Sequence, residues 1–102
     1  MGKNKAIQSL GKVIGNVVVH KVVLKYGKKM ESENHTSSEI VAYRNTAISI
    51  GMEFNWNDND KIEIRKEVHD FFIKKMNEKY SHIKYPGKEA ENIINETIKE
   101  CL

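Results

Sequence analysis

Apolar side chains recur at intervals of three and four residues in several segments of this chain, and that spacing constrains the fold more than any other feature. It gathers the apolar residues on one face of an α-helix, whereas a half-buried strand would alternate them with polar residues. The clearest case is the segment 36–54, which we predict to be a helix with Thr36 and Glu39 as its capping box. Its apolar stripe consists of Ile40, Tyr43, Ala47, Ile50 and Phe54.

The same spacing predicts two further helices, over 58–80 and over 87–101. The first of them follows a run of four Asn and Asp residues from Asn57 to Asp60, side chains that suit the free amides and the positive end of a helix. The second follows Tyr85 and Pro86, which are typical of a turn. With 102 residues the chain is long enough for one compact domain, which we place over 1–102, and too short for two.

The first segment, 1–29, has two interpretations. As a helix it collects Ile7, Leu10 and Ile14 on one face, yet seven of the eleven residues from Val13 to Val23 are β-branched. These residues together disfavour a helix by roughly 3 kcal/mol. As a strand over 16–26 the segment would lack a partner within the chain and would have to pair across a dimer.

The length of this segment bears on the choice. An unbroken helix from Asn4 to Lys28 would be about 37 Å long, while a domain of this size has a radius of gyration of about 13 Å. We therefore expect such a helix to project from the domain or to serve a partner subunit. The strand version resembles the ribbon-helix-helix arrangement, in which two chains each contribute one strand and present the pair to DNA.

Together these observations predict an all-α fold, a small bundle of about four helices. The alternative is an α+β fold, in which an N-terminal strand around 16–26 pairs across a dimer and three helices follow. Gly11 and Gly15 lie four residues apart in the first segment, a spacing that marks either a bend or a packing seam of small residues.

Charge is distributed unevenly along the chain. The first 29 residues carry seven positive and no negative side chains, and the rest carries ten positive and fourteen negative ones. Lysine is a flexible point charge that suits contact with phosphates independent of base sequence. We therefore predict that the segment 1–29 contacts nucleic-acid phosphates without strong sequence specificity. The predicted contact residues are Lys3, Lys5, Lys12, Lys21, Lys25, Lys28 and Lys29.

Two alternatives remain for the same lysines. They form a solvated face, or they pair with acidic residues of the last predicted helix, namely Glu89, Glu91, Glu96 and Glu100. If the lysines and these glutamates lie on different faces, the molecule has one positive pole for phosphate contact. If they interleave, the charge asymmetry is internal neutralisation. A basic amphipathic segment also suits a membrane surface, which we expect less than either protein or nucleic-acid contact.

Trp56 is the single tryptophan and lies in a polar junction beside Phe54. An aromatic residue in such a place suits a partner's pocket, so Trp56 is a predicted partner-binding residue. The alternative is that Trp56 folds back and closes the core between the second and third helices. Because the first segment carries more apolar surface than a small domain needs, we expect a protein partner or self-association, most simply a homodimer.

Sequence motifs for catalysis or cofactor binding are missing from the chain. The four histidines are widely spaced, and one cysteine, Cys101, cannot complete a structural zinc site. His69 and Asp70 read as a pair on a helix surface. We therefore expect no catalytic residues, no metal, no cofactor and no small-molecule substrate. The longest apolar run is three residues and the single cysteine suits a reducing compartment. We thus expect a non-enzymatic cytoplasmic module without a bilayer-spanning segment.

Overall fold

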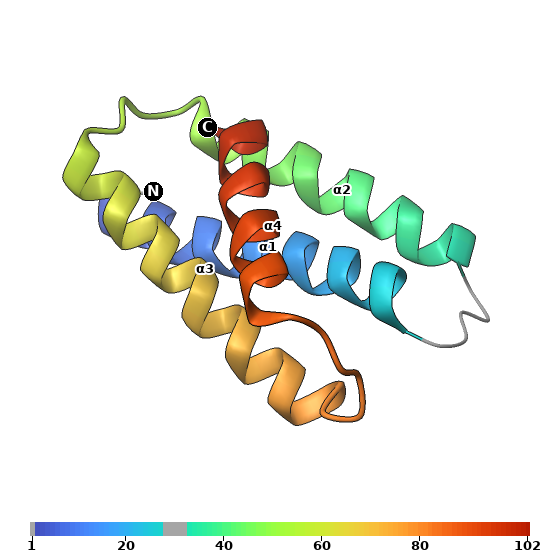
Figure 1. The fold of residues 1–102 in the computed structure, drawn as a ribbon. Helices are drawn as coiled ribbons and strands as arrows, with labels where there is room; N and C mark the ends of the chain where they lie inside the picture. The colour runs from blue at the N-terminus through green and yellow to red at the C-terminus, as the bar shows by residue number, and fades with distance from the viewer. Residues whose placement is uncertain (1, 28–32) are drawn as a thin grey trace.

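The computed structural model describes residues 2–27 and 33–102, with side chains in the second range described from Thr36 onwards. Within these residues the chain forms four helices and no strand. They are α1 (Lys3–Tyr26), α2 (Glu33–Gly51), α3 (Asp58–Lys79) and α4 (Gly87–Cys101), as Figure 1 shows. The prediction of a small all-α bundle is confirmed. The alternative with a strand at 16–26 is wrong, because all of that segment lies in α1.

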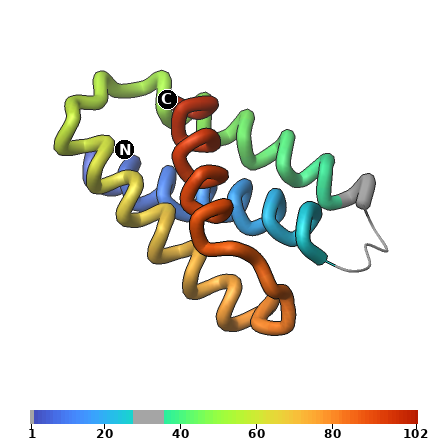
Figure 2. Tube along the Cα trace, in the orientation of Figure 1, coloured from blue at the N-terminus to red at the C-terminus, as the bar shows by residue number. Residues whose placement is uncertain are grey.

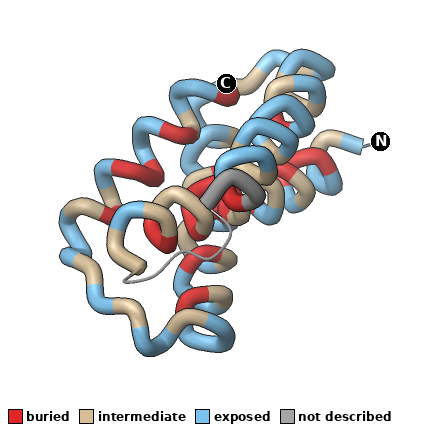
Figure 3. Tube along the Cα trace, turned by 90° about the vertical axis from the view of Figure 1, so that its right-hand side faces the viewer, coloured by how far each residue is buried: buried red, intermediate tan, exposed pale blue. Residues whose placement is uncertain are grey.

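α1 is the central helix of the bundle. It contacts each of the other three helices, and eleven of its 24 residues are buried. Fully burying one valine or isoleucine contributes about 1.5–3 kcal/mol, so burial of this segment outweighs the helix propensity that its β-branched residues lose. In Figure 3 buried positions alternate with exposed ones along the helices. The buried residues of α1 are Ala6, Ile7, Leu10, Gly11, Ile14, Gly15, Val17, Val18, Val19, Val22 and Val23.

The expectation that a helix of this length would project from the domain is wrong. A helix of 24 residues is about 36 Å long. The molecule measures 40 × 25 × 21 Å and has a radius of gyration of 13.3 Å. The bundle is elongated enough to hold α1 along its length, because α2 and α3, with 19 and 22 residues, flank it.

α2 and α3 flank α1, and α4 lies across it (Figures 1 and 2). Among the described residues α2 and α3 make no contact with each other, whereas α4 contacts both. α4 therefore covers one side of α1. The opposite side of α1 lies between α2 and α3 without a helix over it.

α1 and α3 approach each other closely at two glycines. A Cβ atom on Gly11 would collide with the Cβ of Glu67, and a Cβ on Gly15 would lie 2.6 Å from Cδ1 of Phe71. Real Cβ atoms do not sit that close to another side chain, so only glycine allows this separation of the two helices. Of the two interpretations of the Gly11–Gly15 spacing, the structure supports the packing seam.

α2 begins and ends earlier than the predicted range 36–54. Thr36 is the fourth residue of the helix and is buried, so the predicted capping box of Thr36 and Glu39 is wrong. The helix ends at Gly51, where a Cβ atom would lie 2.9 Å from the Cys101 carbonyl oxygen. The end of α4 thus packs against the last turn of α2, and the chain turns away before Phe54.

The last two helices lie close to their predicted ranges. α3 ends at Lys79 rather than residue 80, and α4 has the bounds that the sequence indicated. Asn57 caps the start of α3 through two reciprocal hydrogen bonds with Asp60. Its Oδ1 accepts from the Asp60 amide at 2.8 Å, and its own amide donates to Asp60 Oδ2 at 3.1 Å. The polar run 57–60 therefore caps the start of α3, as predicted, and Asn57 and Asp60 do so as a capping box.

α1 is long and apolar enough to cross a bilayer when judged by length and composition alone, which the short apolar runs of the sequence did not indicate. More than half of its most apolar window, 56%, is buried inside the bundle. The core helix of a globular protein passes the same test, so this property does not locate the protein. The cytoplasmic location stays a prediction.

Candidate functional site

Three of the seven predicted phosphate-binding lysines form ion pairs within the chain. Lys3 Nζ lies 2.6 Å from Asp60 of α3. Lys21 donates to Glu100 at 3.0 Å and to Thr97 Oγ1 at 3.0 Å, and Lys25 pairs with Glu89 at 2.6 Å. The Glu89 carboxylate raises the pKa of Lys25 above its ordinary value. The hydrogen bond from Lys3 holds the pKa of Asp60 below its usual 3.8.

The other four lysines have different surroundings. Lys5 and Lys12 are exposed and make no ion pair with another described residue. Lys28 and Lys29 lie outside the described residues. The expected separation of the N-terminal lysines from the glutamates of the last helix is therefore wrong for Lys21 and Lys25. α4 lies across α1, so their side chains meet, and for these two lysines the charge asymmetry is internal neutralisation.

Trp56 is half-buried and packs against the core. Its indole N–H donates to the Gly51 carbonyl oxygen at 2.8 Å. The ring lies 5.4 Å from that of Phe54, and Lys3 Nζ lies 5.7 Å from the indole centroid. This geometry supports the alternative role, in which Trp56 closes the core between α2 and α3. Partner contact through Trp56 stays a prediction.

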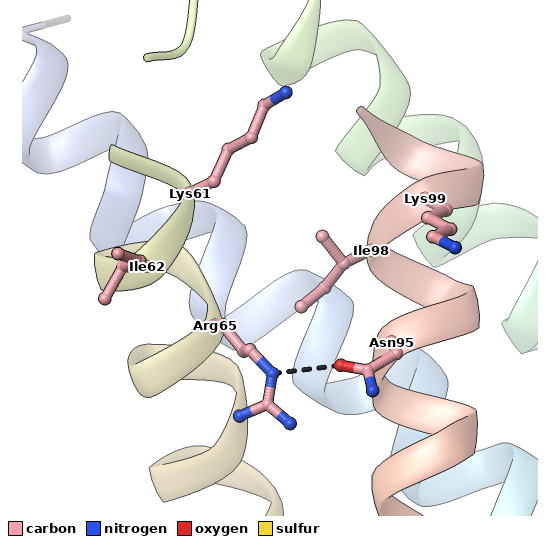
Figure 4. Close-up of a pocket in the computed structure, with 6 residues that line it drawn as sticks. All are labelled: Lys61, Ile62, Arg65, Asn95, Ile98 and Lys99. Atoms are coloured by element: carbon pink, nitrogen blue, oxygen red, sulfur yellow. Dashed lines mark hydrogen bonds between the residues drawn. The ribbon is translucent and has the colours of Figure 1, made fainter. Parts of the chain in front are cut away.

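An apolar groove with a volume of about 350 Å³ lies between the first half of α3 and the last half of α4. We call it the α3–α4 groove. Figure 4 shows Ile98 pointing from α4 into the gap toward α3. Ile62 of α3 is 66% exposed, although it is a large aliphatic residue. The groove is lined by Lys61, Ile62, Arg65, Asn95, Ile98 and Lys99.

The charged residues that line the α3–α4 groove are all cations. Arg65 is held across it, because its Nε donates to Asn95 Oδ1 at 2.9 Å (Figure 4). Its NH2 group also donates to Glu91 at 2.5 Å. Lys61 and Lys99 are exposed and form no ion pair with another described residue. The groove therefore combines an apolar floor with two lysines that form no ion pair with another described residue.

A second hollow lies on the side of α1 that α4 leaves uncovered. It has a volume of about 370 Å³ and is walled by α2 on one side and α3 on the other, with α1 as its floor. We call it the α1–α2–α3 cavity. In contrast to the groove, its lining is mainly polar. It is lined by Asn16, Val19, His20, Val23, Thr36, Glu39, Tyr43, Lys75, Lys79 and Tyr80.

His20 and Glu39 join α1 to α2 in this cavity. His20 Nδ1 lies 2.6 Å from the Asn16 carbonyl oxygen, and Nε2 lies 2.7 Å from Glu39 Oε2. Both ring nitrogens thus lie within hydrogen-bond distance of an oxygen, one in α1 and one in α2. The Tyr43 ring lies 5.8 Å from the imidazole and completes this wall.

The remaining candidates of the sequence are Cys101 and the His69–Asp70 pair. Cys101 is buried, and burial raises the pKa of its thiol to about 11, which keeps it protonated at neutral pH. His69 lies 3.7 Å from both Asp70 and Glu91 at the exposed surface of α3. Within residues 2–27 and 33–102 no group of three His, Cys, Asp or Glu side chains is placed to hold a metal ion.

Comparison of the chain with models of protein families, with curated proteins and with solved structures finds no match. The α3–α4 groove and the α1–α2–α3 cavity are therefore candidate sites on the ground of their geometry alone. Sequence reasoning missed both of them. One signal for the groove was present, because Ile62 lies off the Ile64–Val68–Phe72 stripe of α3 and so had to face elsewhere. The cavity had no such signal, since it forms only where three helices meet.

Proposed function

We propose that this chain is a non-enzymatic protein-interaction module and that the α3–α4 groove binds an acidic amphipathic helix of a partner protein. The observation that carries the proposal is an apolar floor between two lysines that form no ion pair with another described residue. Ile62 is largely exposed, Ile98 points into the gap, and Lys61 and Lys99 stand at the edges. A groove between two helices suits a third helix that lays its apolar face into it.

The charges at the edges of the groove determine which partner helix it binds. Burial of apolar side chains supplies affinity, while charges at the rim select the partner and speed association. Lys61 and Lys99 favour a helix with glutamates or aspartates on either side of its apolar stripe. A basic helix would place like charges together, which costs affinity.

The second function, nucleic-acid contact by the segment 1–29, loses support from the ion pairs. Lys3, Lys21 and Lys25 would each have to give up an internal carboxylate to reach a phosphate. Among the described residues this leaves only Lys5 and Lys12 of the predicted set without a partner. These two lysines alone would release few counterions and bind weakly at physiological salt.

The test is fluorescence anisotropy with a labelled synthetic helix of about 16 residues, leucine at helical spacing and glutamate elsewhere. The same peptide with lysine in place of glutamate is the matched probe. We expect saturable binding of the acidic peptide only, weaker at higher salt. In the full chain, Ile62→Glu or Lys99→Glu should weaken it by about tenfold or more.

Val41→Glu is the control variant, since Val41 is also an exposed aliphatic residue, at 55%, and lies on α2 away from the groove. It should bind the acidic peptide as the unaltered chain does. Equal binding of the two peptides, or equal loss in Val41→Glu and Ile62→Glu, would contradict the proposal. Self-association abolished by Ile62→Glu would instead assign the groove to a second copy of the chain.

A further inference from the structure

The α1–α2–α3 cavity carries an inference that is independent of the proposed function. Its floor is Val19 and Val23 of α1, which are 1% and 8% exposed. These two valines lie about 160° around the helix from Lys21 and Lys25, which face α4. They are buried on the side that α4 leaves uncovered, so the side chains of the cavity walls must cover them.

Positive charge dominates the walls. Lys75 and Lys79 lie one turn apart on α3, and within the described residues neither has a carboxylate partner. Lys75 is half-buried, with its Nζ 5.7 Å from the centroid of the Phe71 ring. Beside them, His20 of α1 and Glu39 of α2 lie 2.7 Å apart. The two lysines are therefore an excess of positive charge beside a hollow.

Two phenol rings stand on opposite walls of the same cavity. Tyr43 comes from α2 and Tyr80 from the end of α3, and both are half-buried. Half-buried aromatic side chains offer flat apolar faces on which a planar ring stacks. The volume of about 370 Å³ is within the range of small-molecule pockets, which runs from about 300 to 1,000 Å³.

We propose that the α1–α2–α3 cavity binds a small phosphorylated molecule with a planar ring. Lys75 and Lys79 hold the phosphate, and the ring lies between Tyr43 and Tyr80. Lysine suits this role because its ammonium group is a compact charge that contacts phosphate oxygens without a fixed geometry. The His20–Glu39 pair keeps α1 and α2 in register at the wall.

The test is a titration of the full chain, labelled with ¹⁵N, followed by its amide NMR spectrum. The probe is adenosine 5′-monophosphate, which carries both a phosphate and a planar ring. Adenosine, ribose 5-phosphate and inorganic phosphate each lack one or more of these parts. We expect saturable shifts for Val19, His20 and Lys79 with the nucleotide, and affinities at least about tenfold weaker for the three fragments.

Charge variants locate the phosphate. Lys75→Gln and Lys79→Gln should each weaken nucleotide binding by about tenfold. Lys74→Gln is the matched control, because Lys74 is an exposed lysine of the same helix that does not line the cavity. It should retain the affinity of the unaltered chain. The amide spectra of all three variants report whether the fold is kept.

Several outcomes would overturn the proposal. One is the lack of saturable shifts up to about 10 mM nucleotide, which corresponds to negligible affinity. Another is a shifted set centred on Ile62 and Lys99, which would place the nucleotide in the groove instead. If Lys74→Gln weakened nucleotide binding as much as Lys75→Gln and Lys79→Gln do, the loss would follow from net charge and not from the cavity. Inorganic phosphate binding as tightly as the nucleotide would show an adventitious ion only.

Discussion

At the scale of single residues, the buried polar side chains that the structure describes all have partners. Thr97 is fully buried, and its Oγ1 donates to the Ile93 carbonyl at 2.7 Å and accepts from Lys21 Nζ at 3.0 Å. A buried hydroxyl without such bonds would cost about 1–3 kcal/mol. Among the described residues no buried side-chain nitrogen or oxygen lacks a hydrogen bond. Lys21 is thus part of the α1–α4 packing.

The thiol of Cys101 gives a prediction on reactivity. Its pKa of about 11 leaves very little thiolate at pH 8, and its side chain is buried at the end of α4. We expect iodoacetamide to alkylate the folded chain far more slowly than the chain in denaturant, because the thiolate is the nucleophile. Mass spectrometry over time measures both rates. Equal rates in the two states would contradict the buried position of Cys101.

The Lys3–Asp60 pair gives a prediction on acid stability. The folded-state pKa of Asp60 is depressed below its ordinary 3.8, chiefly by the hydrogen bond from Lys3. A depressed carboxyl stabilises the fold above its unfolded pKa, and this contribution is lost as the pH falls through the folded value. We therefore expect Asp60→Asn to lose less stability than the unaltered chain between pH 7 and pH 3, measured by urea unfolding.

Asp58→Asn is the control for this comparison. Asp58 lies in the same first turn of α3 but makes no ion pair with another described residue. Its variant should keep the pH dependence of the unaltered chain. An Asp60→Asn chain with unchanged acid sensitivity would show that the pair with Lys3 contributes nothing to stability.

At the scale of helices, the organising feature is the close packing of α1 on α3. Gly11 and Gly15 are one turn apart and face Glu67 and Phe71, which are also one turn apart. Helices that approach this closely bring more atoms into van der Waals contact. This seam, together with the contacts of α2 and α4, lets a valine-rich helix bury so much of its surface in a chain of this size.

Substitution of Gly15 tests the seam. Alanine in place of glycine stabilises a helix interior by roughly 0.5–1 kcal/mol, but overpacking a core costs about 1–3 kcal/mol. Because the new Cβ would lie 2.6 Å from Phe71, we expect Gly15→Ala to destabilise the fold in chemical denaturation. Gly87→Ala is the control, since a Cβ there meets nothing within 4 Å. A Gly15→Ala chain as stable as the unaltered one would contradict the packing seam.

Helix bounds that depend on local sequence pattern were predictable from the sequence. Features that depend on packing between helices were not. The stripe of α4 and the polar run before α3 gave close bounds, since caps and periodicity act within a few residues. The start of α2 was misplaced because Thr36 is buried in the cavity wall rather than capping a helix. The Lys25–Glu89 pair joins residues 64 positions apart, which no local pattern indicates.

At the scale of the whole molecule, the apolar surface of α1 is covered within a single chain. The first segment was expected to need a partner subunit, but α1 packs against α2, α3 and α4 of the same chain. Among the described residues, the α3–α4 groove keeps some apolar surface open to solvent. The largest exposed aliphatic side chains among the described residues are Val41, Met52, Ile62, Ile73 and Leu102.

This packing predicts the state of association. The motive for a homodimer was the apolar surface of the first segment, and that surface is buried. We therefore expect the chain to sediment at micromolar concentration with a mass near 11.8 kDa, that of one copy. A mass that rises toward two copies with concentration would contradict this expectation. It would also favour the α3–α4 groove as the contact between two copies.

The central claim is that this molecule meets its partner through the α3–α4 groove and not through the lysines of its N-terminal segment. The most direct measurement is the amide NMR spectrum of the full chain, titrated in parallel with the acidic amphipathic peptide and a single-stranded oligonucleotide. We predict saturable shifts at Lys61, Ile62, Ile98 and Lys99 with the peptide, and no saturable shift with the oligonucleotide at physiological salt. Saturable shifts at Lys5, Lys12 and Lys21 with the oligonucleotide, and none in the groove with the peptide, would contradict the claim.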